Sequence, residues 1–157
     1  MSEDLKATGE TKEERYRSLL PQVKALLAGE SDAVANMANL CAAIKYGLGY
    51  FWVGFYLVKG GELVLGPFQG PAACTRIRKG RGVCGKCWEQ GEAIIVDDVS
   101  KFPGHIACSA ASKSEIVIPL KDREGNVAGL LDVDHDTAGA FDLTDRKYLA
   151  ELLGLLP

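Results

Sequence analysis

The sequence lacks the features of a membrane, secreted or nucleic-acid-binding protein. No run in its 157 residues approaches the roughly 20 consecutive apolar residues of a membrane span. The first ten residues, MSEDLKATGE, are polar and acidic, whereas a signal peptide needs a basic start and an apolar core. The net charge of −3 gives no reason to expect nucleic acid or an anionic membrane as partner. We therefore expect a cytoplasmic protein.

Cysteine is the residue type that is present and chemically informative. The five cysteines are at positions 41, 74, 84, 87 and 108. In a reducing compartment we do not expect a permanent disulfide framework, and the odd number of cysteines agrees with this. The remaining roles for these cysteines are metal binding, catalysis and inert burial. Cys41 lies on the apolar stripe of a helical segment, so we expect it to be a buried core thiol.

The length and patterning predict one α+β domain. Residues 1–10 are predicted to be a disordered tail, and residues 11–157 a single domain. Thr11 and Glu14 form a capping-box pattern that starts the first helix. Further helices are predicted at 32–48 and 143–156, and strands at 50–58, 62–66, 93–98, 114–121 and 126–135. Hairpins without regular βαβ alternation indicate a mainly antiparallel sheet flanked by helices.

Two carboxylates share one face of the last predicted strand. Alternation in NVAGLLDVDH places Asp132 and Asp134 on the same side, and Glu115 lies near the start of the neighbouring strand. Like charges roughly 7 Å apart are unfavourable unless a cation or solvent compensates them. Either the strand emerges into water at its end, or these acids line a pocket for a cationic group.

Trp52 and Tyr56 share one face of the strand at 50–58. They are either plain core aromatics or rings that cover an alkyl chain or an ammonium group. If their face coincides with that of the acids, the set suits a small aminated molecule such as an amino acid.

The pair Cys84-x-x-Cys87 has three interpretations. With His105-x-x-Cys108 it supplies four possible ligands, all of types that zinc accepts, although a whole predicted strand intervenes. It also has the spacing of a thioredoxin-like couple, but the βαβ context of that motif is absent. Third, one thiol of the pair works with another cysteine and its neighbour is idle.

Three segments resemble the free methionine-(R)-sulfoxide reductases, which are small single-domain enzymes of the GAF fold. They are GPFQGPAACTRIRKGRGVCG, FPGHIACSAASKSEIVIPL and GLLDVDH, and the likeness covers roughly residues 30–157. The resemblance implies a catalytic nucleophile at Cys108, a principal resolving cysteine at Cys84, and Cys74 as a further cysteine that exchanges with it. It also implies that Trp52 and Tyr56 form an aromatic wall, and that the substrate is held by Glu115, Asp132 and Asp134.

The implied activity is thiol-dependent reduction of free L-methionine-(R)-S-oxide, a defence against oxidative stress. It would pass through a Cys108 sulfenic acid and a Cys84–Cys108 disulfide recycled by thioredoxin, with NADPH upstream and no bound cofactor or metal. A homodimer is expected, as family members are often dimers. Cys87 has no counterpart in the family's pattern, so it either competes with Cys84 or is a buried helix residue. The alternatives are a GAF sensor that binds a small ligand without turnover, and a zinc-stabilised structural domain.

Overall fold

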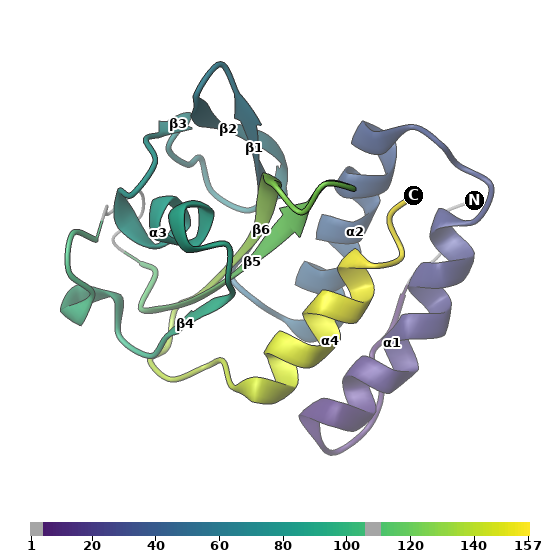
Figure 1. Cartoon of the computed structure of the whole chain (residues 1–157). Coiled ribbons are helices and arrows are strands. Elements are labelled where there is room, and N and C mark those ends of the chain that lie inside the picture. Colours follow the sequence, from purple (N-terminus) through teal and green to yellow (C-terminus); the bar gives the residue numbers. More distant parts are fainter. Residues whose placement is uncertain (1–4, 106–110) are drawn as a thin grey trace.

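A six-stranded antiparallel sheet with helices on both faces makes up the protein (Figure 1). The computed structural model describes residues 5–105 and 111–157. The helices are α1 (Lys12–Leu27), α2 (Ala33–Leu48), α3 (Gly82–Gln90) and α4 (Leu143–Leu153), with a 3-10 helix, η1 (Val99–Lys101). The strands are β1 (Trp52–Lys59), β2 (Glu62–Gln69), β3 (Arg76–Ile77), β4 (Ile94–Val96), β5 (Ser114–Lys121) and β6 (Val127–His135).

Two hairpins, β1–β2 and β5–β6, form the centre of the sheet. The strand order is β3-β2-β1-β6-β5-β4, and each neighbouring pair is antiparallel. β1 and β6 join the two hairpins although they are far apart in the sequence. The predicted α+β class with a mainly antiparallel sheet is therefore confirmed.

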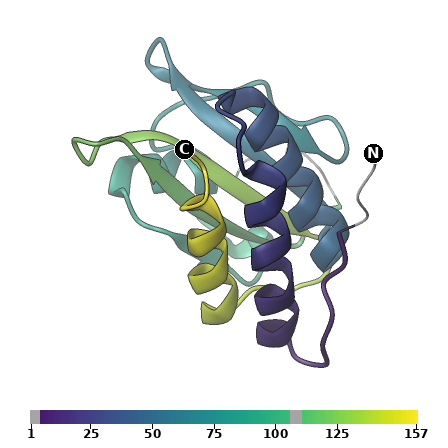
Figure 2. The same ribbon diagram turned by 90° about the vertical axis from the view of Figure 1, so that its right-hand side faces the viewer.

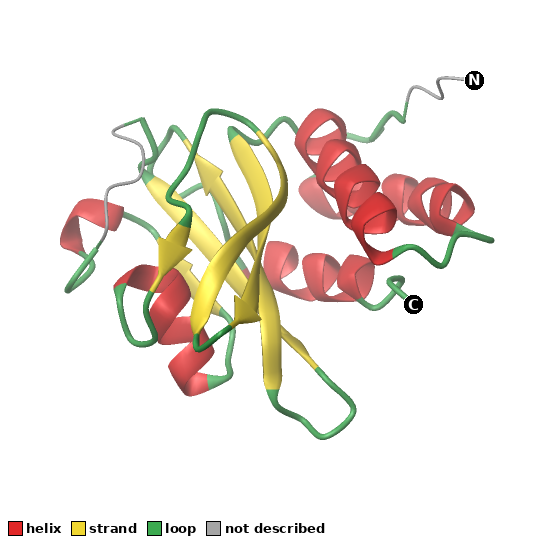
Figure 3. Cartoon of the chain, turned by 90° about the horizontal axis from the view of Figure 1, so that it is seen from above, coloured by secondary structure: helices red, strands yellow, loops and turns green. Residues whose placement is uncertain are grey.

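The helices divide unequally between the two faces of the sheet. α1, α2 and α4 cover one face, while α3 and η1 lie on the other (Figures 2 and 3). Alternation along the strands follows this division, since Val53, Phe55 and Leu131 belong to the core under the three helices, whereas Trp52 and Tyr56 belong to the cluster under α3. None of the helices in the described ranges is long and apolar enough to cross a membrane.

A buried carboxylate ties the three-helix face together. Asp145, in the first turn of α4, is fully buried and accepts hydrogen bonds from the hydroxyls of Tyr16 and Tyr50. Its other oxygen accepts from Lys12 Nζ at 2.7 Å. Burial raises the pKa of both tyrosines, so they remain donors. Asp145 also completes the capping box of α4 with Asp142.

Residues 5–10, part of the predicted disordered tail, instead lie against α1. The backbone N–H of Lys6 donates to Gln22 Oε1 at 3.2 Å, and that of Thr8 donates to Ser18 Oγ at 2.8 Å. Leu5 packs against the core. The polar composition of the tail does not predict these contacts, because they depend on side chains of α1 that accept hydrogen bonds from the backbone of the tail.

Helix α3 and the short strand β3 lie in a segment where the sequence pattern predicts no regular structure. Two glycines within GVCGKCWEQ lower its helix propensity, which obscures the helical pattern. Gly85 is needed because a Cβ there would lie 2.6 Å from the carbonyl oxygen of Arg78. The glycine therefore lets α3 pack tightly against the preceding loop, which fixes the position of Cys84 and Cys87.

Candidate active site

The strand register brings the predicted acids and aromatics onto one face of the sheet. Glu115 on β5 pairs with Asp134 on β6, and Asp134 pairs in turn with Trp52 on β1. Asp132 is two residues from Asp134 and pairs with Gly54. All of these side chains except the glycine line one pocket, and Tyr56 lines it as well. The face of the acids and the face of the aromatic residues, whose relation the sequence left open, therefore coincide.

The three acids are held at unfavourable electrostatic cost. Glu115 and Asp132 are each only 6% exposed, and Asp134 is partly exposed. Loss of solvent is the main cause that raises the pKa of all three well above its ordinary value, and the charges of neighbouring acids raise it further. The acids therefore favour either a shared proton or a bound cation.

The aromatic wall is fixed in position by hydrogen bonds to the loop after β2. Trp52 Nε1 donates to the carbonyl of Pro71 at 2.9 Å, and the Tyr56 hydroxyl donates to the carbonyl of Cys74 at 2.8 Å. The two rings stack with centroids 6.2 Å apart, and Trp52 also stacks with Phe68, with centroids 5.4 Å apart. Rings held in this way form a preorganised apolar surface beside the acids.

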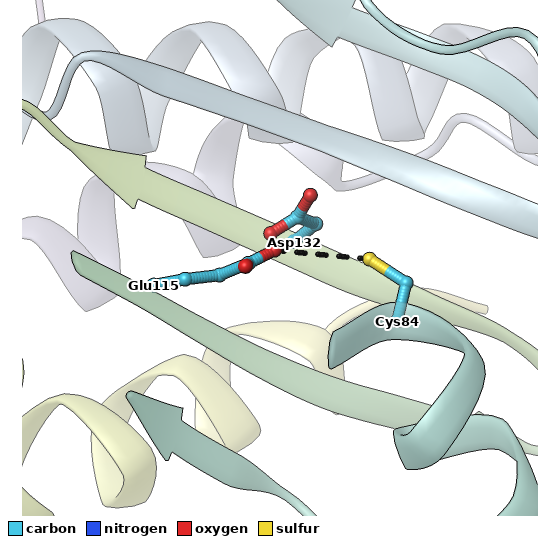
Figure 4. A group of neighbouring side chains, drawn as sticks. All are labelled: Cys84, Glu115 and Asp132. Carbon is cyan, nitrogen blue, oxygen red and sulfur yellow. Dashed lines mark hydrogen bonds between the residues drawn. The ribbon is translucent and has the colours of Figure 1, made fainter. Parts of the chain in front are cut away.

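Cys84 enters the pocket from α3. Its thiol donates a weak hydrogen bond to Glu115 Oε2 at 3.8 Å, and Figure 4 shows it pointing toward Glu115 and Asp132. Burial, together with the charges of Asp132 and Glu115, raises the pKa of Cys84 well above that of a free thiol. In the resting protein Cys84 is therefore a protonated thiol and a poor nucleophile.

Cys87 lies one helical turn further along α3 and does not line the pocket. It is fully buried, and loss of solvent raises its pKa to about 12. This agrees with the interpretation of Cys87 as a buried helix residue. Cys41 is likewise fully buried in the core of the opposite face, as predicted.

Of the remaining two predicted redox cysteines, the structure describes only Cys74. Cys108, the predicted nucleophile, lies outside the described residues. Cys74 is engaged in a disulfide bond and is partly exposed, whereas Cys84 is a free thiol. Cys74, rather than the principal resolving cysteine expected from the resemblance, is thus oxidised in this structure.

The zinc site predicted as an alternative is not formed by its described members. Within 5–105 and 111–157, the only three-residue cluster with metal-ligating atoms close together is Cys84, Glu115 and Asp132. Cys87 and His105 are not part of it. Of the pair Cys84-x-x-Cys87, only Cys84 lines the pocket, whereas Cys87 is fully buried beside it, although residues three apart on a helix lie on neighbouring positions of its surface.

The sequence interpretation missed part of the pocket lining. The pocket is partly open to solvent and is lined by residues of β1, β3, α3, β5 and β6 and of the loops between elements. The described residues that line it but were not predicted to do so are Ala72, Ala73, Ile77, Arg81, Gly82, Val83, His105 and Ser112. Arg81 comes directly before α3, so recognising GVCGKCWEQ as a helix would have drawn attention to it and to the backbone N–H groups that follow.

The geometry suits a small molecule with a cationic group, an apolar portion and an anionic group. The three acids are placed for the cation and the two aromatic rings for the apolar portion. Arg81 and the first turn of α3 lie on the same pocket and favour an anion. A free amino acid has all three features.

This chain is similar in sequence to proteins of the GAF domain family. The GAF domain family model matches residues 32–156. The chain is 59% identical to GAF domain-containing protein A of Dictyostelium discoideum, with 99% of each chain covered. It is 44% identical to the free methionine-R-sulfoxide reductase of Escherichia coli, covering 92% of this chain and 88% of that protein.

A solved structure extends the likeness to the fold. The free methionine-R-sulfoxide reductase of Neisseria meningitidis, in complex with its substrate, is 50% identical and superposes with a TM-score of 0.94. The match covers 98% of this chain and 92% of that one. The chain therefore belongs to the GAF domain family and, within it, to the free methionine-R-sulfoxide reductases.

Proposed function

We propose that this protein reduces free L-methionine-(R)-S-oxide to methionine with electrons from an external dithiol. The observation that carries the proposal is the group of three acids, two of them buried, beside an aromatic wall in a pocket that Cys84 also lines. The Neisseria meningitidis relative, crystallised with its substrate, supports the same substrate class.

The acids provide selectivity for the free amino acid. Glu115, Asp132 and Asp134 receive the α-ammonium group of the substrate, which relieves their mutual repulsion. A peptide-bound methionine sulfoxide has an amide in place of the ammonium and would leave these buried acids unpaired. Trp52 and Tyr56 cover the alkyl chain.

The chemical step transfers the sulfoxide oxygen to a cysteine. The Cys108 thiolate attacks the sulfur, the oxygen is protonated, and methionine leaves while Cys108 becomes a sulfenic acid. Asp134 or Glu115 supplies the proton, since each is held partly protonated by burial and by the charges around it. A carboxyl with an ordinary pKa would already have lost that proton at neutral pH.

Resolution of the sulfenic acid requires a second thiol. Cys84 condenses with Cys108, forming a disulfide and releasing water, and Cys74 then exchanges with Cys84. Two facts support this order: Cys84 is buried in the pocket, whereas Cys74 is partly exposed and disulfide-bonded. Exchange would move the disulfide to where thioredoxin can reach it, with NADPH as the upstream electron source.

The deciding experiment is NADPH consumption with thioredoxin, thioredoxin reductase and methionine sulfoxide. We expect turnover of the free R epimer and little turnover of the S epimer or of N-acetylmethionine sulfoxide. Cys108→Ser should be inactive, because a hydroxyl is not ionised near neutral pH, whereas Cys87→Ser should recycle nearly normally. Ligand binding without any turnover by the reduced wild type would instead indicate a GAF sensor.

Peptide mapping at successive times separates the resolving thiols. After one turnover without reductant, a Cys84–Cys108 bridge should appear first and be replaced by a bridge that contains Cys74. Cys84→Ser should release about one methionine per site and then recycle slowly or stall. A dominant Cys87–Cys108 bridge would contradict the proposed order and assign resolution to the neighbouring thiol.

Two further expectations concern the protein's setting. A thiol cycle of this kind needs a reducing compartment, which favours the cytoplasm. A homodimer is expected from the family, and light scattering coupled to size-exclusion chromatography would test it.

A further inference from the structure

Three potential metal ligands of two chemical kinds meet in the lining of the pocket. The Cys84 Sγ atom and one carboxylate oxygen each from Glu115 and Asp132 all lie within 4.8 Å of one another. They come from three separate elements, α3, β5 and β6, and their side chains converge (Figure 4). All three residues are buried.

One of these groups is incompletely satisfied. Asp132 is 94% buried, and its Oδ1 atom has no hydrogen-bond partner within the part of the chain that the structure describes. A buried carboxylate oxygen without a donor is costly, so the residue favours a cation or a donor from outside the chain. The substrate ammonium group proposed above is one species that could pair with this oxygen, and a metal cation is another.

We infer that Cys84, Glu115 and Asp132 form a binding site for a thiophilic divalent cation, Zn²⁺ or Cd²⁺. The cation displaces the thiol proton to solvent, and the thiolate and two carboxylates become three ligands of a four-coordinate ion. Zinc takes sulfur at about 2.3 Å and carboxylate oxygen at about 2.0–2.2 Å, so tetrahedral ligand atoms lie roughly 3.5 Å apart. The present separations need only small side-chain movements to reach that geometry.

The ligand set discriminates between cations. A thiolate favours soft or borderline ions, whereas Mg²⁺ and Ca²⁺ prefer six or more oxygen ligands and retain water. The fourth ligand would be water, since the pocket is partly open to solvent. This arrangement differs from the Cys-x-x-Cys zinc clamp, because it uses one cysteine of the pair and two acids from the sheet.

The cation and the amino acid compete for the same acids. Binding of the ion removes Asp132 and Glu115 from the recognition of an ammonium group and Cys84 from the thiol cycle. The consequence is reversible inhibition of the reductase, and that consequence rests on the proposed function. Metal binding itself does not.

The test measures metal directly in reduced, metal-free protein. Cadmium is titrated while the ultraviolet thiolate-to-metal charge-transfer band is recorded, and zinc is titrated by calorimetry. We expect one equivalent to bind to the wild type. Cys84→Ser should lose the band. Asp132→Asn should bind the cation at least about tenfold more weakly, because even changing a hydrogen-bond partner of a metal ligand typically costs that much affinity.

Matched controls identify the site. Cys87→Ser alters the neighbouring buried thiol on the same helix, and Asp136→Asn alters an exposed acid near the end of β6; both should bind like the wild type. Repeating the series with Cys74 and Cys108 both changed to serine removes the other thiols of the proposed redox cycle. Circular dichroism checks that each variant is folded, and Asp132→Asn preserves the shape of the side chain.

The outcomes separate this inference from the proposed reaction. A band that persists in Cys84→Ser, or that is lost equally in Cys87→Ser, would overturn the cation site. Added free methionine sulfoxide should weaken apparent cadmium affinity if both ligands share the acids. If the metal-free enzyme showed no turnover but the charge-transfer band followed Cys84 and Asp132, the proposed function would fail while the cation site would stand.

Discussion

Both faces of the sheet bury carboxyl groups, but the two environments are opposite in kind. Under α1 and α4, Asp145 is fully buried and has a lysine and two tyrosine hydroxyls as partners. Under α3, Glu115 and Asp132 are almost as deeply buried, yet their charged neighbour is another acid, Asp134. The first carboxylate has its donors within the chain, whereas Glu115, Asp132 and Asp134 form no ion pair with a lysine or arginine among residues 5–105 and 111–157.

The difference separates a structural charge from a functional one. A buried carboxylate with complete hydrogen bonding holds elements together, and removing its charge leaves the partners unsatisfied. A group of buried acids without a cation costs free energy in the empty protein, and a cationic ligand recovers it. Neutralising Asp145 should therefore lower stability and leave activity unchanged. Neutralising an acid of the pocket should lower activity without lowering stability.

The largest effect is expected on the face covered by α1 and α4. Asp145→Asn replaces an acceptor of the Lys12 ammonium by an amide donor, so it loses charge-assisted hydrogen bonds that contribute roughly 1.5–3 kcal/mol each. We expect a loss of about 3 kcal/mol and a fall in Tm of roughly 6–12 °C for a chain of this size. Thermal unfolding measures it, with exposed Asp136→Asn as the control.

Activity provides the complementary reading of the same variant. Folded Asp145→Asn should reduce methionine sulfoxide at the wild-type rate, because Asp145 is on the other face from the pocket. A large fall in kcat of the fully folded variant would blur the comparison, since it would show that this network also shapes the pocket.

A smaller effect, of opposite sign in stability, is expected in the pocket. Asp132→Asn and Asp134→Asn should each lower kcat/KM at least roughly tenfold, since a charge-assisted bond to an ammonium contributes about 1.5–3 kcal/mol. Each should also keep or raise Tm, because one of the repelling charges is gone. Steady-state kinetics and calorimetry on the same samples test both halves. Wild-type kinetics in both variants would place substrate recognition elsewhere.

The smallest effect is expected in the pH dependence of stability. Burial and neighbouring charges raise the folded pKa of Glu115, Asp132 and Asp134 above unfolded values of about 4. Between the unfolded and folded pKa values the folded state binds more protons, so these groups make stability fall as pH rises. From about pH 5 to about pH 7, the wild type should therefore lose more stability than Asp132→Asn.

Denaturant unfolding at several pH values measures the difference between the two proteins, which cancels groups that both share. A saturating amino-acid ligand should reduce the loss in the wild type by pairing the acids. A loss that is equal in both proteins would mean that these carboxyls stay ionised in the folded state without strain.

Much of the fold could be predicted because it depends on local patterns. The helix cap at Thr11, the alternation in NVAGLLDVDH and the short connection between the strands predicted at 114–121 and 126–135 each depend on a few residues. The corresponding helix, strand and hairpin are present. Helix α3 was missed because its glycines serve a contact with Arg78, and that contact is not local in pattern. The polar composition of residues 5–10 predicts disorder, although α1 supplies partners for their backbone.

The sequence by itself determined the residue types of the site and the face that each occupies on its own strand. A side-chain period of two put Asp132 with Asp134, and Trp52 with Tyr56, without reference to any other segment. Only the tertiary structure decided that these faces coincide, because the pairing of β1 with β6 joins segments about 80 residues apart, as the register of Trp52 with Asp134 shows. It alone also placed Cys84 against Glu115 while burying Cys87, and gave Asp145 its lysine. These contacts depend on the long-range packing of separate elements. No local pattern therefore encodes which buried acid pairs with a lysine of the chain and which is left to pair with a ligand.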